Sequence, residues 1–171
     1  MLSAKPAFPL PGFLGPEQIA MIDKGVSAIV ASSDALLRPS LMRAVGSAIT
    51  PDGCEVTVWL VRGSARQLLL DIAATGRIAV VFSEPATHRT VQLKAASGVR
   101  MRDASEADRP VLARYLASME HEVGRVGYGP HYVRAMLSHR LEDTVAVSFV
   151  PEQAFDQTPG PRAGTPLGST R

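Results

Sequence analysis

The sequence is poor in aromatic residues and carries little net charge. Phenylalanine, tryptophan and tyrosine make up 5% of its 171 residues, so we expect an aliphatic core. Lysine and arginine number 18 and aspartate and glutamate 16, which leaves a net charge of +2 at pH 7. Such a small excess does not create the cationic surface that holds nucleic acid, and a nucleic-acid-binding function is therefore not expected.

Cysteine and metal-binding motifs are also scarce. Cys54 is the single cysteine, so an internal disulfide cannot form. His88, His121, His131 and His139 do not follow a compact ligand spacing, and no metal site is predicted. The chain lacks an apolar run long enough to span a membrane, and prolines interrupt its first residues where a secretory signal is continuous. These absences favour a cytoplasmic protein.

Familiar catalytic motifs are absent as well. The sequence has no GxSxG nucleophile motif and no Walker-type GxxxxGK loop. Gly124, Gly127 and Gly129 follow a predicted helix instead of a strand, which argues against a dinucleotide-binding fingerprint. Residue patterns therefore nominate no catalytic side chain.

Proline and glycine concentrate at both ends of the chain. Residues 1–16 are expected to be an extended arm with apolar side chains to bury, and residues 17–155 a single domain. Residues 156–171 form a second arm rich in proline and glycine, which we expect to be disordered from about Thr165.

Between the arms, β-branched residues mark a series of strands. A helix over 16–24, ended by Gly25, comes first. The predicted strands are 26–33, 40–50 and 54–61, and, after a helix over 65–76, 77–83, 88–102 and finally 143–150. Because the connections between sequential strands are short, we expect them to pair antiparallel.

A second group of helices is predicted in the last third of the chain. Asp103, Ser105 and Glu106 are typical of a helix start. The helix that follows has an apolar stripe of Val111, Leu112, Tyr115, Leu116 and Met119. A short helix is predicted over 130–141. Since strands outnumber helices, we expect a mainly β fold: a closed or nearly closed antiparallel barrel with helices packed outside it.

The turn from Val61 to Gln67 has an unusual charge for a helix start. Helix N-termini favour acidic residues, yet Arg62 and Arg66 add positive charge here and no acid is present. Backbone N–H groups, the Ser64 hydroxyl and two guanidinium groups would together suit a phosphate monoester. Alternatively, Ser64 caps the helix and both arginines are solvated.

Arg43 and Arg89 fall inside predicted strands. On an inward face each would need a carboxylate or phosphate partner, whereas on an outward face neither needs one. Trp59 leads toward the suspected anion site, where it would either border a flat ring system or pack a subunit or domain contact.

Three segments in order, SLMRAVG, VTVWLVRGSARQLLLDIAATGRIAVVFSEP and HRTVQLKA, resemble the pyridoxamine 5′-phosphate oxidase-like FMN-binding split-barrel family. The match covers roughly residues 17–103. Arg43 and Val45 match the family's R-x-V strand, Ser64 and Arg66 its phosphate-holding turn, and Arg89 to Val91 its later strand. The resemblance implies an antiparallel six-stranded split β-barrel that binds FMN.

The resemblance and the charge pattern together suggest a set of cofactor-binding residues. These are Arg43, Ala44, Val45, Val61, Ser64, Arg66, Gln67, Arg89 and Thr90. The C-terminal residues lack the arginine- and tryptophan-rich segment of true pyridoxamine phosphate oxidases, which implies a general family member.

Family members are typically homodimers with the flavin at the subunit interface, and the resemblance implies the same here. The leading hypothesis is an FMN-dependent oxidoreductase that acts on a small-molecule redox substrate or takes electrons from a nicotinamide donor. The alternatives are a binding module for flavin or haem without turnover, and a dimeric interaction protein without a cofactor.

Overall fold

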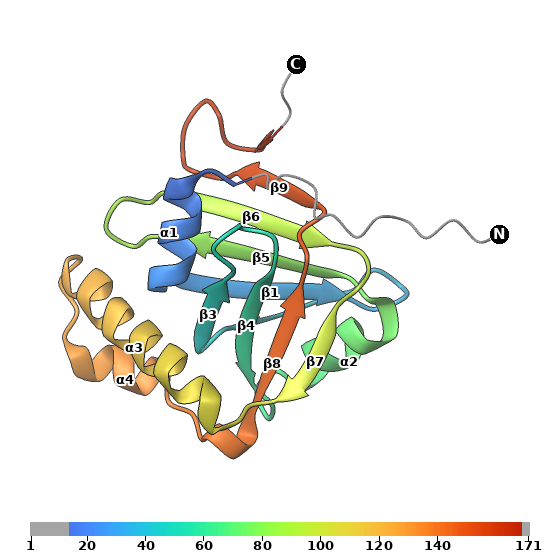
Figure 1. The fold of residues 1–171 in the computed structure, drawn as a ribbon, viewed down its shortest axis with the longest axis horizontal. Helices are drawn as coiled ribbons and strands as arrows, with labels where there is room; N and C mark the ends of the chain where they lie inside the picture. The colour runs from blue at the N-terminus through green and yellow to red at the C-terminus, as the bar shows by residue number, and fades with distance from the viewer. Residues whose placement is uncertain (1–13, 169–171) are drawn as a thin grey trace.

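The computed structural model describes residues 14–168, which form two antiparallel β-sheets surrounded by helices (Figure 1). The strands are β1 (Ser27–Ser33), β2 (Pro39–Arg43), β3 (Gly46–Ile49), β4 (Val56–Val61), β5 (Ile78–Ser83), β6 (Thr90–Ala95), β7 (Arg100–Asp103), β8 (Thr144–Phe149), β9 (Gln153–Asp156) and β10 (Thr165–Pro166). One sheet has the order β10-β9-β6-β5-β1-β2 and the other β3-β4-β8-β7. The predicted mainly β fold and its antiparallel pairing are confirmed.

The helices lie at both ends of this pair of sheets (Figure 1). They are α1 (Pro16–Lys24), α2 (Arg66–Thr75), α3 (Arg109–Gly124) and α4 (Pro130–Met136), with short 3₁₀ turns at Glu106–Asp108 and Leu141–Asp143. Helix α2 packs on β1 and β2, whereas α1 and α3 pack on β3. Helices α1, α2 and α4 fall within predicted helical segments, although α4 ends five residues earlier than its predicted limit at 141. Helix α3 is also found, but it begins at Arg109, because Asp103 ends β7 and Glu106 begins a 3₁₀ turn.

The expected closed or nearly closed six-stranded barrel is corrected by the sheet topology. The ladders of residues 14–168 make two separate sheets of six and four strands. Ala44 and Val45 link them, because the Ala44 N–H donates to the Ala28 carbonyl of β1 at 2.9 Å and the Val45 N–H to the Trp59 carbonyl of β4 at 2.8 Å. The strand predicted over 40–50 is therefore two strands, one in each sheet.

The strand predicted over 88–102 divides in the same way, into β6 of the six-stranded sheet and β7 of the four-stranded sheet. Strand β8 is not the last one either, because β9 pairs with β6 and β10 pairs with β9. Thr165 and Pro166 thus belong to a sheet, where disorder was expected. The expected N-terminal arm lies outside the described residues except for Leu14 to Pro16, and the same holds for residues 169–171 of the C-terminal arm.

The core consists of two apolar clusters, and the larger one fills the space between the sheets. Its central side chains include Val30, Val58, Phe82 and Leu93, all fully buried. The smaller cluster lies where α3 covers the four-stranded sheet and includes the predicted stripe residues Leu112, Tyr115 and Met119.

Tyr115 and Trp59 are both buried in this smaller cluster. The Tyr115 hydroxyl accepts a hydrogen bond from the Ala28 N–H at 3.2 Å, and burial raises the pKa of Tyr115 to about 12. Trp59 is 3% exposed and packs beside Leu112 and Gly46. Trp59 thus packs inside the domain, which is neither the ring border nor the subunit or domain contact expected from the sequence. No helix of residues 14–168 combines the length and apolar character needed to cross a bilayer.

Candidate functional site

The turn from the end of β4 to the start of α2 carries four of the predicted cofactor-binding residues: Val61 ends β4, Ser64 lies in the loop, and Arg66 and Gln67 begin α2. Helix α2 begins at Arg66, after Ala65 as N-cap, and its first turn contains no acidic residue. The Ser64 hydroxyl donates to the Val61 carbonyl at 3.4 Å and does not cap the helix. Ser64 and Arg66 are exposed. The positive end of the α2 dipole therefore has no anionic side chain to offset it.

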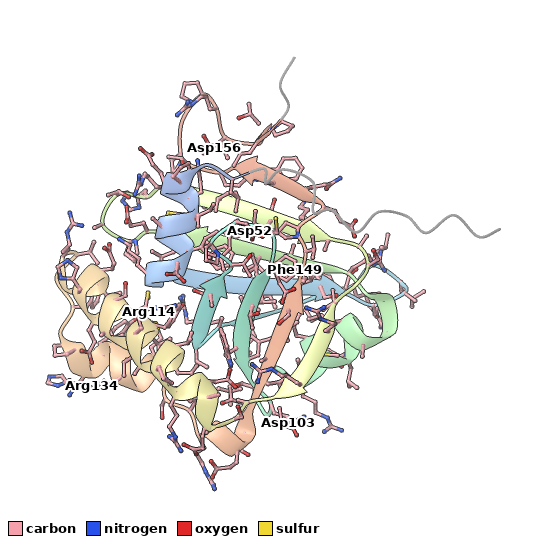
Figure 2. All side chains as sticks on the ribbon, viewed as in Figure 1. Asp52, Asp103, Arg114, Arg134, Phe149 and Asp156 are labelled. Carbon is pink, nitrogen blue, oxygen red and sulfur yellow. The ribbon has the colours of Figure 1, made fainter. Side chains whose placement is uncertain are left out.

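Arg62 and Arg66 differ in their partners. The Arg62 guanidinium forms an ion pair with the Asp103 carboxylate, and both side chains are largely exposed. Asp103 lies at the end of β7 (Figure 2). Among residues 14–168, the Arg66 guanidinium has neither a hydrogen bond nor an ion pair. Arg66 lines a cavity of about 290 Å³ with the apolar side chains of Leu69 and Met101. Of the two arginines that the sequence nominated for an anion, only Arg66 has a charge that no carboxylate of the described residues neutralises.

Most cations of the described residues lie within ion-pair distance of a carboxylate. Within residues 14–168 the exceptions are Arg43, Arg66, Arg77 and Lys94. Two of these four, Arg43 and Arg66, were selected from the sequence as cofactor-binding residues. A cation without an intramolecular partner is available to a ligand anion.

Arg43 lies on the outer face of the six-stranded sheet, opposite the face that packs on the core. Its Nη1 donates to the Ser27 hydroxyl at 2.7 Å. Ser27 pairs across β1 and β5 with Ser83, and the Ser83 hydroxyl lies 2.8 Å from the Thr90 hydroxyl of β6. Polar side chains thus lie in a row across four strands, from Arg43 to Thr90, with Ser27 and Ser83 paired in the strand register.

The predicted residues Ala44, Val45 and Val61 have apolar side chains, and the main chain of this segment joins the two sheets. Ala44 is fully buried at the crossing between the sheets, and its neighbour Val45 is bonded to β4 two residues before Val61. This backbone link holds the Arg43 strand beside the β4 end that leads into the Arg66 turn. The two charged parts of the predicted site are therefore connected by main-chain hydrogen bonds.

Asp71 of α2 is a functional candidate that sequence reasoning missed. Its side chain is 4% exposed, and it accepts hydrogen bonds from the Ser40 hydroxyl at 2.5 Å and from the Gln67 amide at 2.8 Å. Ser40 lies on β2 three residues before Arg43, and Gln67 follows Arg66. Gln67 is therefore bound to Asp71, which ties the first turn of α2 to the Arg43 strand.

Arg89 lies in a different environment from Arg43 and Arg66. Its guanidinium is 3.3 Å from the buried Glu84 carboxylate and 3.6 Å from that of Glu17. Arg89 and Thr90 line a separate cavity of about 170 Å³ between α1, β6 and the C-terminal residues. Of the nine predicted residues, Arg66 lines the cavity beside α2, Arg89 and Thr90 line the cavity beside α1, and the other six line neither of these two cavities.

Glu84 anchors the loop that carries Arg89. Lys24 Nζ lies 2.5 Å from Glu84 and 3.0 Å from the buried Glu122 carboxylate of α3. Burial alone would raise the pKa of Glu84, but the hydrogen bond from Lys24, followed by those from Thr87 and Arg89, outweighs it and lowers the pKa to about 2. Burial likewise opposes the charge on Lys24, yet the two carboxylates raise its pKa.

Comparison with known proteins adds the fold class. No protein-family model and no curated protein matches the sequence. Among solved structures, HupZ from Group A Streptococcus aligns with a TM-score of 0.54 at 14% identity, over 88% of this chain and 99% of that one. An F420 reductase aligns with a TM-score of 0.51 at 14% identity, over 79% and 93%. A pyridoxamine 5′-phosphate oxidase candidate from Lactobacillus delbrueckii aligns with a TM-score of 0.50 at 16% identity, over 83% and 93%.

These likenesses define the class of protein by its fold. The two antiparallel sheets, joined at Ala44 and Val45, have the split-barrel architecture of the pyridoxamine 5′-phosphate oxidase-like proteins. The resemblance drawn from the sequence is confirmed at the level of the fold. At sequence identities of 14% to 16%, the substrates and activities of those proteins cannot be assigned to this chain.

Proposed function

We propose that this protein is an FMN-binding flavoprotein that acts as an oxidoreductase. The observation that supports this most concerns Arg66, the first residue of α2. The first turn of α2 contains no acidic residue, and the Arg66 guanidinium has no carboxylate partner in residues 14–168. A phosphate monoester would neutralise Arg66 and the helix dipole together. The exposed Ser64 hydroxyl adds a neutral donor on the same turn.

The donor set fits the phosphate of FMN in its chemistry. Arg66 and Ser64 would hold the phosphate, with Arg43 as the second cation that lacks a carboxylate partner. Thr90, three strands away at the other end of the polar row, would contribute its hydroxyl to another part of the cofactor. Gln67 would act indirectly through Asp71, and Arg89 through its bonds to Glu84. When bound, FMN supplies the hydride or electron transfer, and the chain supplies binding and orientation.

We also propose a homodimer with the cofactor at its interface. The outer face of the six-stranded sheet supports this proposal, because it combines half-buried Ile29, Ala31 and Val81 with Leu41, which is 63% exposed. An apolar sheet face of this kind is typical of a contact between protein surfaces. A two-fold contact through it would bring the Arg43 and Thr90 rows of two copies together.

The single cysteine supports a cytoplasmic location.

An absorption spectrum tests the proposed function. The purified protein is incubated with excess FMN, freed of unbound cofactor by gel filtration and scanned from the near ultraviolet to the red. We expect flavin bands with a shifted position, because the ring enters a protein environment. NADH and NADPH are then added without oxygen to measure the rate of flavin reduction.

The possible outcomes separate the candidate functions. Bound flavin that neither nicotinamide reduces would favour a binding module. A Soret band in the spectrum of the protein as purified would indicate that haem, and not flavin, is the bound cofactor. If the protein shows no visible absorption band after incubation with FMN and gel filtration, the interaction protein without a cofactor is favoured. The proposal would then be wrong.

A further inference from the structure

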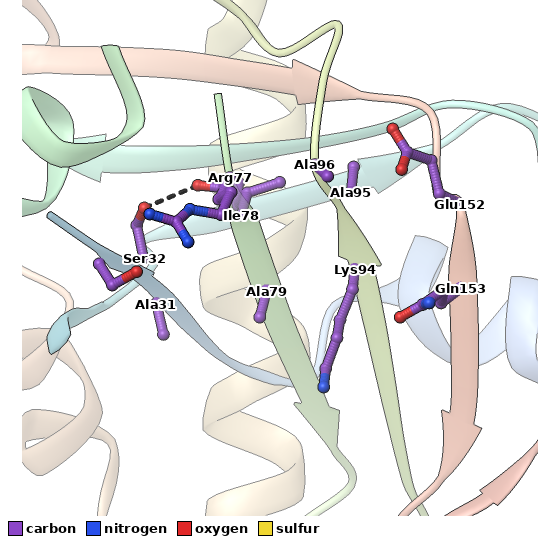
Figure 3. A pocket seen from close by; sticks show the side chains of 11 residues that line it. Ala31, Ser32, Arg77, Ile78, Ala79, Lys94, Ala95, Ala96, Glu152 and Gln153 are labelled. Atoms are coloured by element: carbon purple, nitrogen blue, oxygen red, sulfur yellow. Dashed lines mark hydrogen bonds between the residues drawn. The ribbon is translucent and has the colours of Figure 1, made fainter. Parts of the chain in front are cut away.

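The remaining two cations without a carboxylate partner, Arg77 and Lys94, line one and the same cavity (Figure 3). The cavity has a volume of about 340 Å³ and lies between the ends of β1 and β6 and the starts of β5 and β9. It sits at the opposite end of these strands from the polar row of Arg43 and Thr90. It is therefore separate from the site proposed for FMN.

The charges around this cavity are not balanced within the described residues. Arg77 Nη2 donates to the Asp34 main-chain carbonyl at 3.1 Å, which leaves the guanidinium charge unneutralised. Lys94 Nζ lies 5.0 Å from the centre of the Phe155 ring, an attraction that positions the ammonium without neutralising it. Glu152 is the one carboxylate of the lining, and it accepts a hydrogen bond from the Ser97 hydroxyl at 2.8 Å. The lining therefore has one net positive charge.

The floor of the cavity is apolar and made of small side chains. Ala31, Ile78, Ala79, Ala95 and Ala96 line the cavity, and Ile78 lies beside Arg77 at the start of β5 (Figure 3). Because alanine fills little space on these strands, the cavity is large enough for a small organic molecule. An apolar floor with cations at the rim suits a molecule that has an apolar body and one anionic group.

We propose that this cavity binds a small organic monoanion, a carboxylate with an aromatic or aliphatic body. Lys94 and Arg77 would contact the carboxylate, and the alanines would contact the body. The net charge of the lining favours a monoanion over a dianionic phosphate, since the Glu152 carboxylate repels a second negative charge. None of the lining residues belongs to the predicted cofactor set. Ala31 also lies on the sheet face proposed for the homodimer contact, so the cavity is tested by itself, without added FMN.

Benzoate is a suitable probe, and benzamide is its neutral counterpart of the same shape. Binding to the full chain without added FMN is followed by amide chemical shifts in a titration. We expect saturable shifts at Ala79 and Ala95 with benzoate and much smaller ones with benzamide. The Lys94→Met variant should bind benzoate about tenfold more weakly, whereas Lys94→Arg should retain most of the affinity.

Two further variants keep the test decisive. Arg77→Gln removes the second cation and should also weaken benzoate binding. It therefore tests the proposal even if Lys94→Met disturbs the sheet. Arg100→Gln removes a cation of the four-stranded sheet that is paired with Glu55 and should leave benzoate affinity unchanged. The proposal is overturned if benzoate fails to saturate up to its solubility limit, if benzamide binds equally well, or if both Lys94→Met and Arg77→Gln retain the wild-type affinity.

Discussion

The Arg43 guanidinium donates a hydrogen bond of 2.7 Å to the Ser27 hydroxyl, and this contact is the first of a polar row that ends at Thr90. Ser27 is neutral, so the bond orients Arg43 without cancelling its charge. The row crosses β2, β1, β5 and β6 on the outer face of the sheet. Residues far apart in sequence thus present one cation and several hydroxyls on one surface.

Replacement of Arg43 tests whether this cation serves a ligand. Arg43→Gln should weaken FMN binding about tenfold or more, because a charge-assisted bond to phosphate is lost. The free energy of unfolding should change by less than about 0.5 kcal/mol, since the side chain is half-exposed and has no carboxylate partner. Arg100→Gln, which removes an exposed ion pair with Glu55, is the control. Equal FMN dissociation constants for the two variants would exclude Arg43 from the site.

Asp71 should act as a positioning residue for the start of α2. Asp71→Ala leaves the Ser40 hydroxyl and the Gln67 amide without their shared acceptor, so we expect a loss of about 1 to 3 kcal/mol in the free energy of unfolding. Asp71→Asn keeps one acceptor oxygen and should lose less. Both changes are measured by urea unfolding, with Glu106→Gln at the exposed start of the 3₁₀ turn as control.

The same variants separate positioning from simple stability. If Asp71 holds the first turn of α2, then Asp71→Ala should also weaken FMN binding under conditions where the variant is fully folded, and Asp71→Asn should restore part of it. A variant of reduced stability with wild-type FMN affinity would show that Asp71 serves the fold alone.

The Glu84 and Lys24 contact predicts how stability depends on pH. The pKa of Glu84 is about 2 in the folded chain and about 4.5 when unfolded, so the unfolded state binds the proton first as pH falls. The stability that Glu84 contributes is complete above its unfolded pKa and is lost as pH falls from about 4.5 toward 2. Unfolding by urea at a series of pH values should therefore show a weaker acid dependence for Glu84→Gln than for the wild type. Parallel curves would contradict the assignment.

Gly46 marks the close contact between α3 and the four-stranded sheet. A Cβ at this position would lie 2.7 Å from Leu112 Cδ2 and 3.2 Å from Trp59 Cε3. Gly46→Ala should therefore cost about 1 to 3 kcal/mol of stability through overpacking. Gly124→Ala, where a Cβ meets nothing within 4 Å at the end of α3, should be neutral or stabilising by up to about 1 kcal/mol. Thermal unfolding compares the two, and similar melting temperatures would contradict the packing.

Local sequence patterns predicted the helices and most strands because they depend on neighbours along the chain. Pro16 and Gly25 bound α1, and the stripe that includes Leu112 and Met119 is buried as its spacing indicated. The division of residues 40–50 into β2 and β3 was missed, since Ala44 and Val45 continue the strand pattern and their change of partner depends on two other strands. Short strand β9 was missed for a similar reason: its pairing with β6 supplies the order that its own residues do not indicate.

The candidate site was predictable only in part. The charge at Arg66 was visible in the sequence because a helix start without an acid is a local feature. The pairing of Arg62 with Asp103 joins distant segments, so it could not be inferred from spacing. Arg89 and Glu84 belong to one loop, and their pairing depends on the conformation of that loop, which the strand pattern did not indicate. Asp71 could have been suspected from one signal: an acid between the apolar Leu70 and Ile72 of an otherwise apolar stretch of α2.

The central claim is that Arg66 and Ser64 hold the phosphate of FMN, and a fluorescence titration tests it most directly. FMN is titrated with the wild type, with the double variant Ser64→Ala and Arg66→Ala, and with Arg62→Ala, whose cation is already paired with Asp103. Riboflavin, which lacks the phosphate, is titrated in parallel. We predict that the double variant binds FMN at least tenfold more weakly and riboflavin as the wild type does, while Arg62→Ala changes neither affinity by more than about twofold. Superimposable FMN titration curves for the wild type and the double variant would contradict the account.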